Sequence, residues 1–297
     1  MDRSKAHPLA FLALLTGSSF LAFGPWLVRL SRTGPFAAGL WRLALALPFL
    51  FLIARVAGQP MHWPGKAMAA LVALAAFFFA ADLAAWHTGI HMTKLGNATL
   101  FGNVSSFAFA AWGLWLARRW PSRIQGAALL LAALGAGLLM GSSAELSARN
   151  LHGDLLALLA GVLYAGYLIA VERARGVLAP VPLLFLASAF GAAMLLPFAL
   201  LFGEQVIPQD WTFVVLLGLS SQVLGQGLLV YAIGHVSPLI VGLTLLTQPA
   251  ISALVGWAVY GETLSPLDWI GALAIAAALV LVRLPQRSLQ PAPQGAS

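Results

Sequence analysis

The stretch AMAALVALAAFFFAADLAAWHTG, residues 67–89, decides the fold class of this chain. It is almost wholly apolar, and as a helix rising about 1.5 Å per residue it crosses a hydrocarbon core of about 30 Å. A transmembrane β-barrel would instead show segments of about ten alternating residues. The sequence therefore predicts an all-α integral membrane protein. We expect ten transmembrane helices, at residues 9–29, 35–56, 67–89, 95–117, 122–141, 152–172, 181–202, 211–233, 238–259 and 266–283.

The composition agrees with this fold class. Of the 297 residues, 61% are hydrophobic and 8% are charged, whereas soluble domains carry about 25% charged residues. Such a chain would have no solvated surface in water, so the lipid bilayer must be the solvent for much of it. The net charge of +7 comes from basic residues at the ends of apolar runs, which argues against a nucleic-acid partner. The chain has no cysteine, and this excludes disulfides and thiolate metal sites.

The loops set the orientation. An even number of spans puts both termini on one side of the membrane, and most of the 16 Lys and Arg residues fall in loops on that side. Because positively charged loops stay in the cytoplasm, we expect both termini to be cytoplasmic. The first apolar run lacks a small-residue cleavage site and is interpreted as a retained span. We expect a multi-pass protein of the cell inner (plasma) membrane.

An internal repeat divides the chain into two halves. A shift of 145 residues superposes spans four and five on spans nine and ten without gaps, and five spans is an odd number, so the two copies would have opposite orientations. We expect one five-helix repeat over 1–144, a second over 145–284, and a disordered cytoplasmic tail over 285–297. The matched pairs are Thr99 with Thr244, Asn103 with Gln248, Trp112 with Trp257, Pro121 with Pro266, and Gly126 with Gly271.

Polar side chains are unevenly distributed among the spans. Residues 126–140 and 271–282 contain no hydrogen-bonding side chain, and span seven has almost none. These helices can face lipid or another subunit, and we expect a monomer or a weak dimer. Spans one, three, four, six, eight and nine hold the polar residues and are the candidates to line a water-filled path, because polar groups inside a membrane are costly.

Eight residues form the candidate substrate site: Asp82, Trp86, Asn103, Tyr164, Gln222, Gln226, Thr244 and Gln248. Asp82 and Trp86 are spaced i, i+4 and share a helix face, as do Gln222 and Gln226. Each residue type also has a structural interpretation. Serine and threonine bond back to the i−4 carbonyl, amides join helices to one another, and tryptophan anchors a helix at the membrane interface.

Asp82 is the acidic residue that lies deepest inside a span. Two interpretations stay open. Its carboxylate could be structural, either paired, for example with Arg42 of the neighbouring span, or lying closer to the membrane interface. Alternatively it could bind a substrate ammonium group or a proton. Arg42 could likewise be structural or contact the substrate.

Signatures of enzymes and of metal or cofactor sites are missing from the sequence. There is no P-loop, no HExxH and no GxSxG motif. His87 and His91 have the i, i+4 spacing of a chelating pair, but no carboxylate or thiol stands at a matching position. We expect no catalytic residue, no metal and no cofactor.

Several motifs resemble those of a known family. Residues 81–87 (ADLAAWH) with 93–100 (TKLGNATL), 153–157 (GDLLA), and 261–267 (GETLSPL) with 271–273 (GAL) are similar to motifs of EamA-type carriers in the drug/metabolite transporter superfamily, and YddG-type amino-acid exporters are the members that the chain resembles most. Two departures are Arg118-Arg119 in place of a Gly-Glu pattern, and Ser105-Ser106 where a proline is common.

The resemblance implies two inverted five-helix repeats, a central cavity and export of small metabolites. By motif position it implies that Asn103, Tyr164 and Gln248 are cavity residues. We therefore expect an exporter of amino acids, aromatic and other, or of related small metabolites. The alternatives are a multidrug or nucleotide-sugar carrier of the same fold, and a non-transporting membrane scaffold or sensor.

Overall fold

The computed structural model describes residues 8–93, 95–118, 120–141, 147–148, 150–260 and 264–283. These residues form helices joined by short loops, with no β-strand among them. The helices of the first half are α1 (Pro8–Ala22), α2 (Gly24–Leu30), α3 (Pro35–Ala44), α4 (Ala46–Val56), α5 (Lys66–Met92), α6 (Leu95–Gly102), α7 (Val104–Leu116) and α8 (Arg123–Gly141). Those of the second half are α9 (Leu151–Ala174), α10 (Pro180–Leu201), α11 (Trp211–Leu217), the π-helix η1 (Gly218–Gln226), α12 (Gly227–Ile233), α13 (Pro238–Leu245), α14 (Thr247–Tyr260) and α15 (Pro266–Arg283). The expected repeat boundary at 144/145 and the expected tail 285–297 lie outside the described residues.

Six helical stretches are long and apolar enough to cross a membrane: Pro8–Leu30, Pro35–Val56, Lys66–Met92, Leu151–Ala174, Pro180–Leu201 and Trp211–Ile233. Each agrees within three residues at either end with a span expected from the sequence. Shorter apolar helices cover Arg123–Leu138, Pro238–Leu254 and Pro266–Val282. The chain is thus an all-helical, multi-pass membrane protein. The total of ten spans in two inverted repeats stays a prediction.

Three of the helix breaks come just before a proline. The α1–α2 break at Phe23 precedes Pro25, the α3–α4 break at Leu45 precedes Pro48, and the α13–α14 break at Leu246 precedes Pro249. Proline donates no backbone hydrogen bond, and its ring clashes with the carbonyl four residues earlier, so a helix kinks there. The fourth break, at Asn103, has no proline beside it. There the side-chain amide of Asn103 donates to the carbonyl of Thr99 at 2.7 Å.

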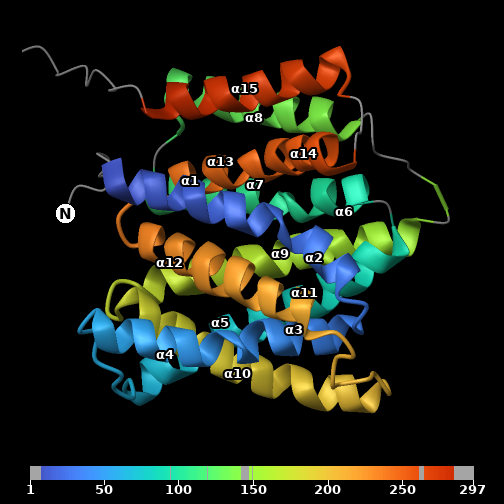
Figure 1. Ribbon diagram of the computed structural model, residues 1–297. Coiled ribbons are helices and arrows are strands. Elements are labelled where there is room, and N and C mark those ends of the chain that lie inside the picture. Colours follow the sequence, from blue (N-terminus) through green and yellow to red (C-terminus); the bar gives the residue numbers. More distant parts are fainter. Residues whose placement is uncertain are drawn as a thin grey trace, which may run out of the picture.

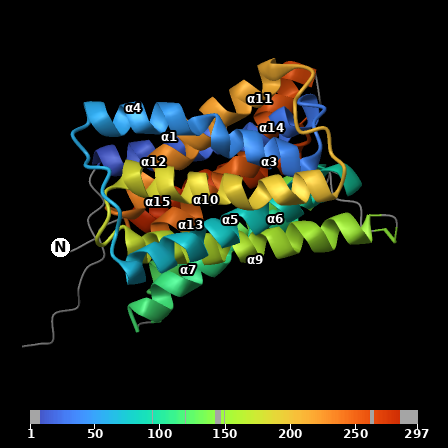
Figure 2. The same ribbon diagram turned by 90° about the horizontal axis from the view of Figure 1, so that it is seen from below.

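The helices run side by side, and their packing sets two opposite edges of the molecule (Figure 1). At one edge α8 packs along α15. At the other, α10 packs against α3, α4 and α5 (Figure 2). Between these edges α5 lies along α9, α7 along α13, and α1 along η1 and α12. Helices from the two halves of the chain are therefore interleaved.

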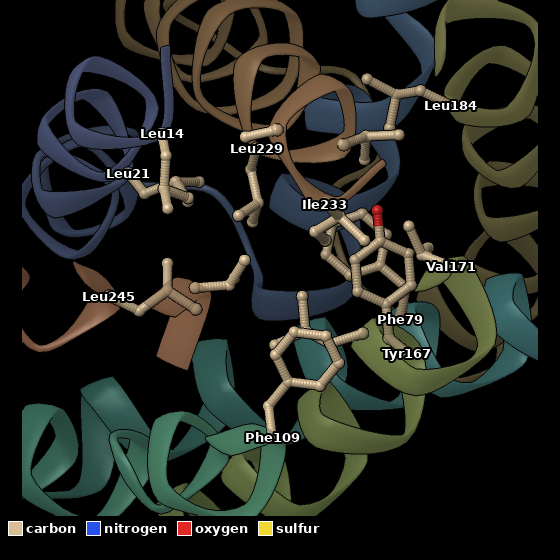
Figure 3. Close-up of a cluster of buried hydrophobic side chains, with 14 of the residues drawn as sticks. Leu14, Leu21, Phe79, Phe109, Tyr167, Val171, Leu184, Leu229, Ile233 and Leu245 are labelled. Atoms are coloured by element: carbon tan, nitrogen blue, oxygen red, sulfur yellow. The ribbon is translucent and has the colours of Figure 1, made fainter. Parts of the chain in front are cut away.

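A single large cluster of buried apolar side chains holds the interleaved helices together (Figure 3). It includes Leu14 of α1, Phe79 of α5, Phe109 of α7, Tyr167 of α9 and Leu229 of α12. The Phe79 and Tyr167 rings stack with their centroids 4.4 Å apart and an interplanar angle of 15°. The cluster thus fixes α5 and α9 against each other beside the cavity described below.

Glycine lets two helix pairs approach closely. A Cβ atom on Gly17 of α1 would lie 2.9 Å from the backbone oxygen of Gly225 in η1. One on Gly242 of α13 would lie 2.3 Å from the backbone oxygen of Ser106 in α7. Small residues at such positions allow membrane helices to pack backbone to backbone. Both contacts join the first half of the chain to the second.

Candidate functional site

A cavity of about 80 Å³ lies between the two halves of the chain. Helices α1, α2, α3, α5, α6 and α7 contribute to its lining from the first half, and α9, η1, α13 and α14 from the second. The helix break at Asn103 borders the cavity, and residues on both sides of the α13–α14 break line it. The polar lining residues are Arg42, Asp82, Trp86, Thr99, Asn103, Ser105, Ser106, Tyr164, Gln226, Gln248 and Ser252.

Six of the eight candidate residues line this cavity: Asp82, Trp86, Asn103, Tyr164, Gln226 and Gln248. Thr244 is fully buried elsewhere, and its hydroxyl donates to the carbonyl of Ile240 at 2.8 Å, which is the back-bonded arrangement of a structural threonine. Gln222 is also fully buried and lies behind the cavity. That any of these residues binds a substrate stays a prediction.

Arg42 and Asp82 bring opposite charges to the same cavity. Arg42 is 4% exposed and Asp82 is 8% exposed, and both side chains line the cavity. Across the described ranges, however, no salt bridge joins them and no hydrogen bond reaches the Asp82 carboxylate. Of the two interpretations of Asp82, direct pairing with Arg42 is therefore not what the structure has.

Gln222 holds Arg42 from behind. The Nε of Arg42 donates to Oε1 of Gln222 at 3.3 Å, and Nε2 of Gln222 donates to the hydroxyl of Ser188 at 3.0 Å. The Arg42 guanidinium carbon also lies 5.7 Å from the centroid of the Phe79 ring, within the range of a cation–π contact. A series of side-chain hydrogen bonds, from Ser188 of α10 through Gln222 of η1, thus orients the Arg42 guanidinium of α3.

Gln226 links two tyrosines of α9. Its Nε2 donates to the hydroxyl of Tyr164 at 2.9 Å, and the hydroxyl of Tyr167 donates to its Oε1 at 3.4 Å. The two tyrosine rings stack with centroids 5.6 Å apart. Of the three residues only Tyr164 and Gln226 face the cavity. The Gln226 amide therefore uses one donor and one acceptor on the two tyrosines, and Tyr164 presents a positioned ring to the cavity.

The π-helix η1 carries both glutamines. A π-helix bonds i to i+5, and such segments are frequent at functional sites. Within η1, Gln222 contacts the arginine that lines the cavity and Gln226 lines the cavity itself. The sequence predicts one regular helical span over residues 211–233. Apart from the glycines around Gln226, it contains no signal for the π-helix.

Trp86 lies between two other helices. The edge of its indole lies near Gly24 of α2, and its Nε1 lies near Gly102 of α6, at 3.8 and 3.4 Å from the positions where a Cβ would stand. A larger residue at either glycine would narrow the space for the ring. The indole is thus a lining group of the cavity rather than an anchor at the membrane interface.

Polar contacts also join helices at one end of the molecule, the end predicted to face outside. Asp154 at the start of α9 accepts from the hydroxyl of Thr93 at 2.6 Å and from the amide of Asn97 at 2.9 Å. Arg29 donates to the carbonyl of Ile90 at 3.0 Å. A second cavity, of about 490 Å³, lies at this end between residues 30–34 and 205–213. On its rim the backbone N–H of Thr212 donates to Asp210 and lowers the pKa of that carboxyl.

Several residues that line the cavity are not among the eight candidates predicted from the sequence. Arg42 is the most important, because the second span was not expected to line the path. A lone arginine inside an apolar span is the signal that could have found it, since intramembrane charge is costly. Thr99, Ser105, Ser106 and Ser252 also line the cavity. Nothing in their spacing separates them from serines and threonines that bond only to their own helix.

Comparisons with known proteins find similarity to transporters. Residues 151–284 match the model of the EamA-like transporter family. Two proteins of Archaeoglobus fulgidus, each described as an uncharacterized transporter, are similar in sequence. One is 27% identical over 208 residues, which cover 67% of this chain and 68% of that protein. The other is 28% identical over 154 residues, which cover 52% and 54%.

A solved structure shares the fold. The crystal structure of another protein superposes with a TM-score of 0.79 and 16% sequence identity, covering 93% of this chain and 96% of that one. At this identity the similarity concerns the fold alone.

Proposed function

We propose that this membrane protein, whose residues 151–284 match the EamA-like transporter family, is a transporter that exports amino acids or related small amphipathic metabolites by alternating access. The observation that carries the proposal is the central cavity, which is lined from both halves of the chain by charged, amide and aromatic side chains. Transporters built from repeats bind their substrates at such a position, between the halves.

The packing of the helices supports the alternating-access part. If the halves are inverted repeats, α1 corresponds to α9, and α5 corresponds to the stretch from α11 to α12. The contact of α1 with η1 and α12 then corresponds to that of α9 with α5, the α8–α15 contact joins corresponding helices, and the α7–α13 contact joins parts of corresponding spans. This broadly similar packing of the two halves would allow them to exchange conformations and to open the cavity to either side in turn.

The size and chemistry of the cavity favour a small solute. Binding sites for drug-sized ligands occupy about 300–1,000 Å³, so a cavity of about 80 Å³ would have to widen several-fold for a nucleotide sugar or a drug. Tyr164 and Trp86 offer aromatic surfaces for an apolar side chain. Asn103 and Gln248, which occupy equivalent positions in the proposed repeat, offer amides for polar groups. These features favour an amino acid over the larger alternatives.

The direction and the membrane are part of the proposal. The excess of basic residues in one set of loops favours cytoplasmic termini, and the resemblance to amino-acid exporters favours outward movement across the inner membrane. A carrier of this kind needs no catalytic residue and no cofactor. Both facilitated diffusion and exchange against protons fit a cavity with one carboxylate.

The test is a counterflow screen. Purified protein in proteoliposomes loaded with each common amino acid in turn should accumulate the same labelled amino acid from outside, in at least one case well above protein-free vesicles. Nucleotide sugars and a cationic dye serve as comparison solutes. Counterflow of those alone would favour the alternative carriers, and counterflow of nothing would favour a scaffold or sensor. Repeating the assay with and without a pH gradient separates diffusion from proton exchange.

A further inference from the structure

Two buried charged side chains line the cavity, and neither has a full set of hydrogen-bond or ion-pair partners. Arg42 and Asp82 are each more than nine-tenths buried and both line the cavity. Burying a charge is costly unless it is paired and hydrogen-bonded. Within the described part of the chain, Asp82 accepts no hydrogen bond and Arg42 uses only its Nε, toward Gln222. The arrangement therefore leaves an anionic and a cationic group facing the same space.

The guanidinium of Arg42 is oriented for a ligand. Its Nε is held by Gln222, which is itself held by Ser188, so the side chain is fixed from behind. Its two terminal nitrogens make no hydrogen bond to the described residues, and a guanidinium presents such nitrogens in a fork that fits a carboxylate. Arg42 is thus built as an anion-binding group and not as half of a salt bridge.

Two opposite charges that line one cavity suit a ligand that carries both signs. Arg42 and Asp82 both line the cavity, and within the described residues no salt bridge joins them. An α-amino acid carries its carboxylate and its ammonium on one carbon, so it can satisfy both groups at once. We infer that the cavity selects zwitterions, with Arg42 binding the carboxylate of the solute and Asp82 binding its ammonium group. This inference rests on the proposed function.

The inference assigns a selectivity. A charged hydrogen bond lost from a buried site weakens binding by about tenfold or more. An acid without the ammonium group would leave Asp82 unsatisfied, and an amine without the carboxylate would leave Arg42 unsatisfied. Both should bind at least about tenfold more weakly than the amino acid with the same side chain.

The experiment uses matched sets of three compounds: L-phenylalanine, hydrocinnamate and phenethylamine, and L-leucine, isocaproate and isoamylamine. Each is tested as a competitor of counterflow of the best-transported amino acid, and as a ligand that raises the Tm of the purified full-length protein. The Tm measurement needs no turnover, so it remains usable for variants that do not transport. In the wild type we expect the amino acids to act at concentrations about tenfold below both analogues.

The variants Asp82→Asn and Arg42→Gln should each lose the preference for the amino acid over one of its two analogues. In Asp82→Asn the acid should bind as well as the amino acid, while the amine stays weak. In Arg42→Gln the amine should bind as well as the amino acid, while the acid stays weak. The charge-retaining variants Asp82→Glu and Arg42→Lys should keep the preference for the zwitterion.

Two results are distinct failures. If no amino acid gives counterflow or a Tm shift in the wild type, the proposed function is wrong. If amino acids are transported but the three compounds of a set compete equally, or if both neutral variants weaken all three to the same extent, the zwitterion site is overturned and the two charges are structural.

Discussion

Helices α8 and α15 pack on each other at one edge of the molecule, while α5 and η1 lie beside the cavity at its centre. The edge region has few side chains that can form a hydrogen bond, and the central region has several. No described residue of α8 or α15 lines the cavity, and residues 126–138 and 271–282 are apolar throughout. Helix α5 contributes Asp82 and Trp86, and η1 contributes Gln226. Polar side chains are costly in contact with lipid, so they gather where the helices enclose the cavity, which is the proposed path of the solute.

Asp82→Asn is expected to have the largest effect on this comparison. Replacing the carboxylate should leave insertion intact and lower counterflow of amino acids by at least about tenfold, or about 1.4 kcal/mol, because the charge that faces the solute is lost. Initial rates in proteoliposomes check this.

The matched control for that variant is Asp268→Asn in α15. Asp268 is equally buried, but its Oδ2 accepts from the backbone N–H of Ser265 at 2.8 Å, which caps the helix. Counterflow should stay within about twofold of the wild type, less than about 0.5 kcal/mol. Normal transport by Asp82→Asn would refute the assignment of the central region as the path.

Gly242→Ala tests the packing of the central helices. The new Cβ would lie 2.3 Å from the backbone oxygen of Ser106, so α7 and α13 must move apart. We expect a loss of about 1–3 kcal/mol of stability, seen as a lower Tm in detergent. Gly126→Ala in α8 is the control, because nothing lies within 4 Å of its Cβ. It should leave the Tm unchanged or slightly raised. Equal losses in both variants would contradict the difference between the regions.

Tyr164→Phe should have a smaller effect. It removes the hydroxyl that accepts a hydrogen bond from Gln226 at 2.9 Å, and we expect the binding free energy of the solute to weaken by about 1 kcal/mol. The apparent affinity for the solute should fall by a few-fold, measured as the concentration for half-maximal counterflow. The control Tyr231→Phe removes a hydroxyl that makes no hydrogen bond to the described residues, and it should behave as the wild type. An unchanged Tyr164→Phe would mean that the Gln226 network does not order the cavity.

Leu130→Ala should have the smallest effect. Leu130 of α8 is 66% exposed and would face lipid. Removing its side chain should change stability by less than about 0.5 kcal/mol and leave counterflow unaltered. A clear drop in Tm, together with a shift to a smaller species in size-exclusion chromatography, would instead show that a second copy covers this helix.

The path of the chain could be predicted where one physical rule dominates. The limits of the six long apolar stretches follow from hydropathy and length, because the thickness of the bilayer fixes both. The cavity side chains on α5 could also be predicted, because Asp82 and Trp86 are polar or amphipathic residues on one face of an apolar helix.

The remaining features depend on contacts between distant residues. Thr99 and Thr244 occupy equivalent positions in the predicted repeat, yet only Thr99 lines the cavity. The carbonyl of Thr244 accepts from Ser18 at 3.3 Å, and that neighbour is 226 residues away. The position of Arg42 at the cavity could not be predicted for the same reason, since Gln222, which orients its side chain, is 180 residues away. Which face of a helix turns inward is decided by such partners.

The winding of η1 bears on how the chain tolerates a lost residue. In a regular α-helix such as α5, deleting one residue rotates everything beyond it by about 100° and turns the lining side chains away. Residues 218–226 already hold more residues per turn than an α-helix does. A deletion there can be absorbed by rewinding to the tighter form, so α12 would keep its register against α1. Among the long apolar helices, the stretch from α11 to α12 is thus where the loss of one residue would disturb the helix register least.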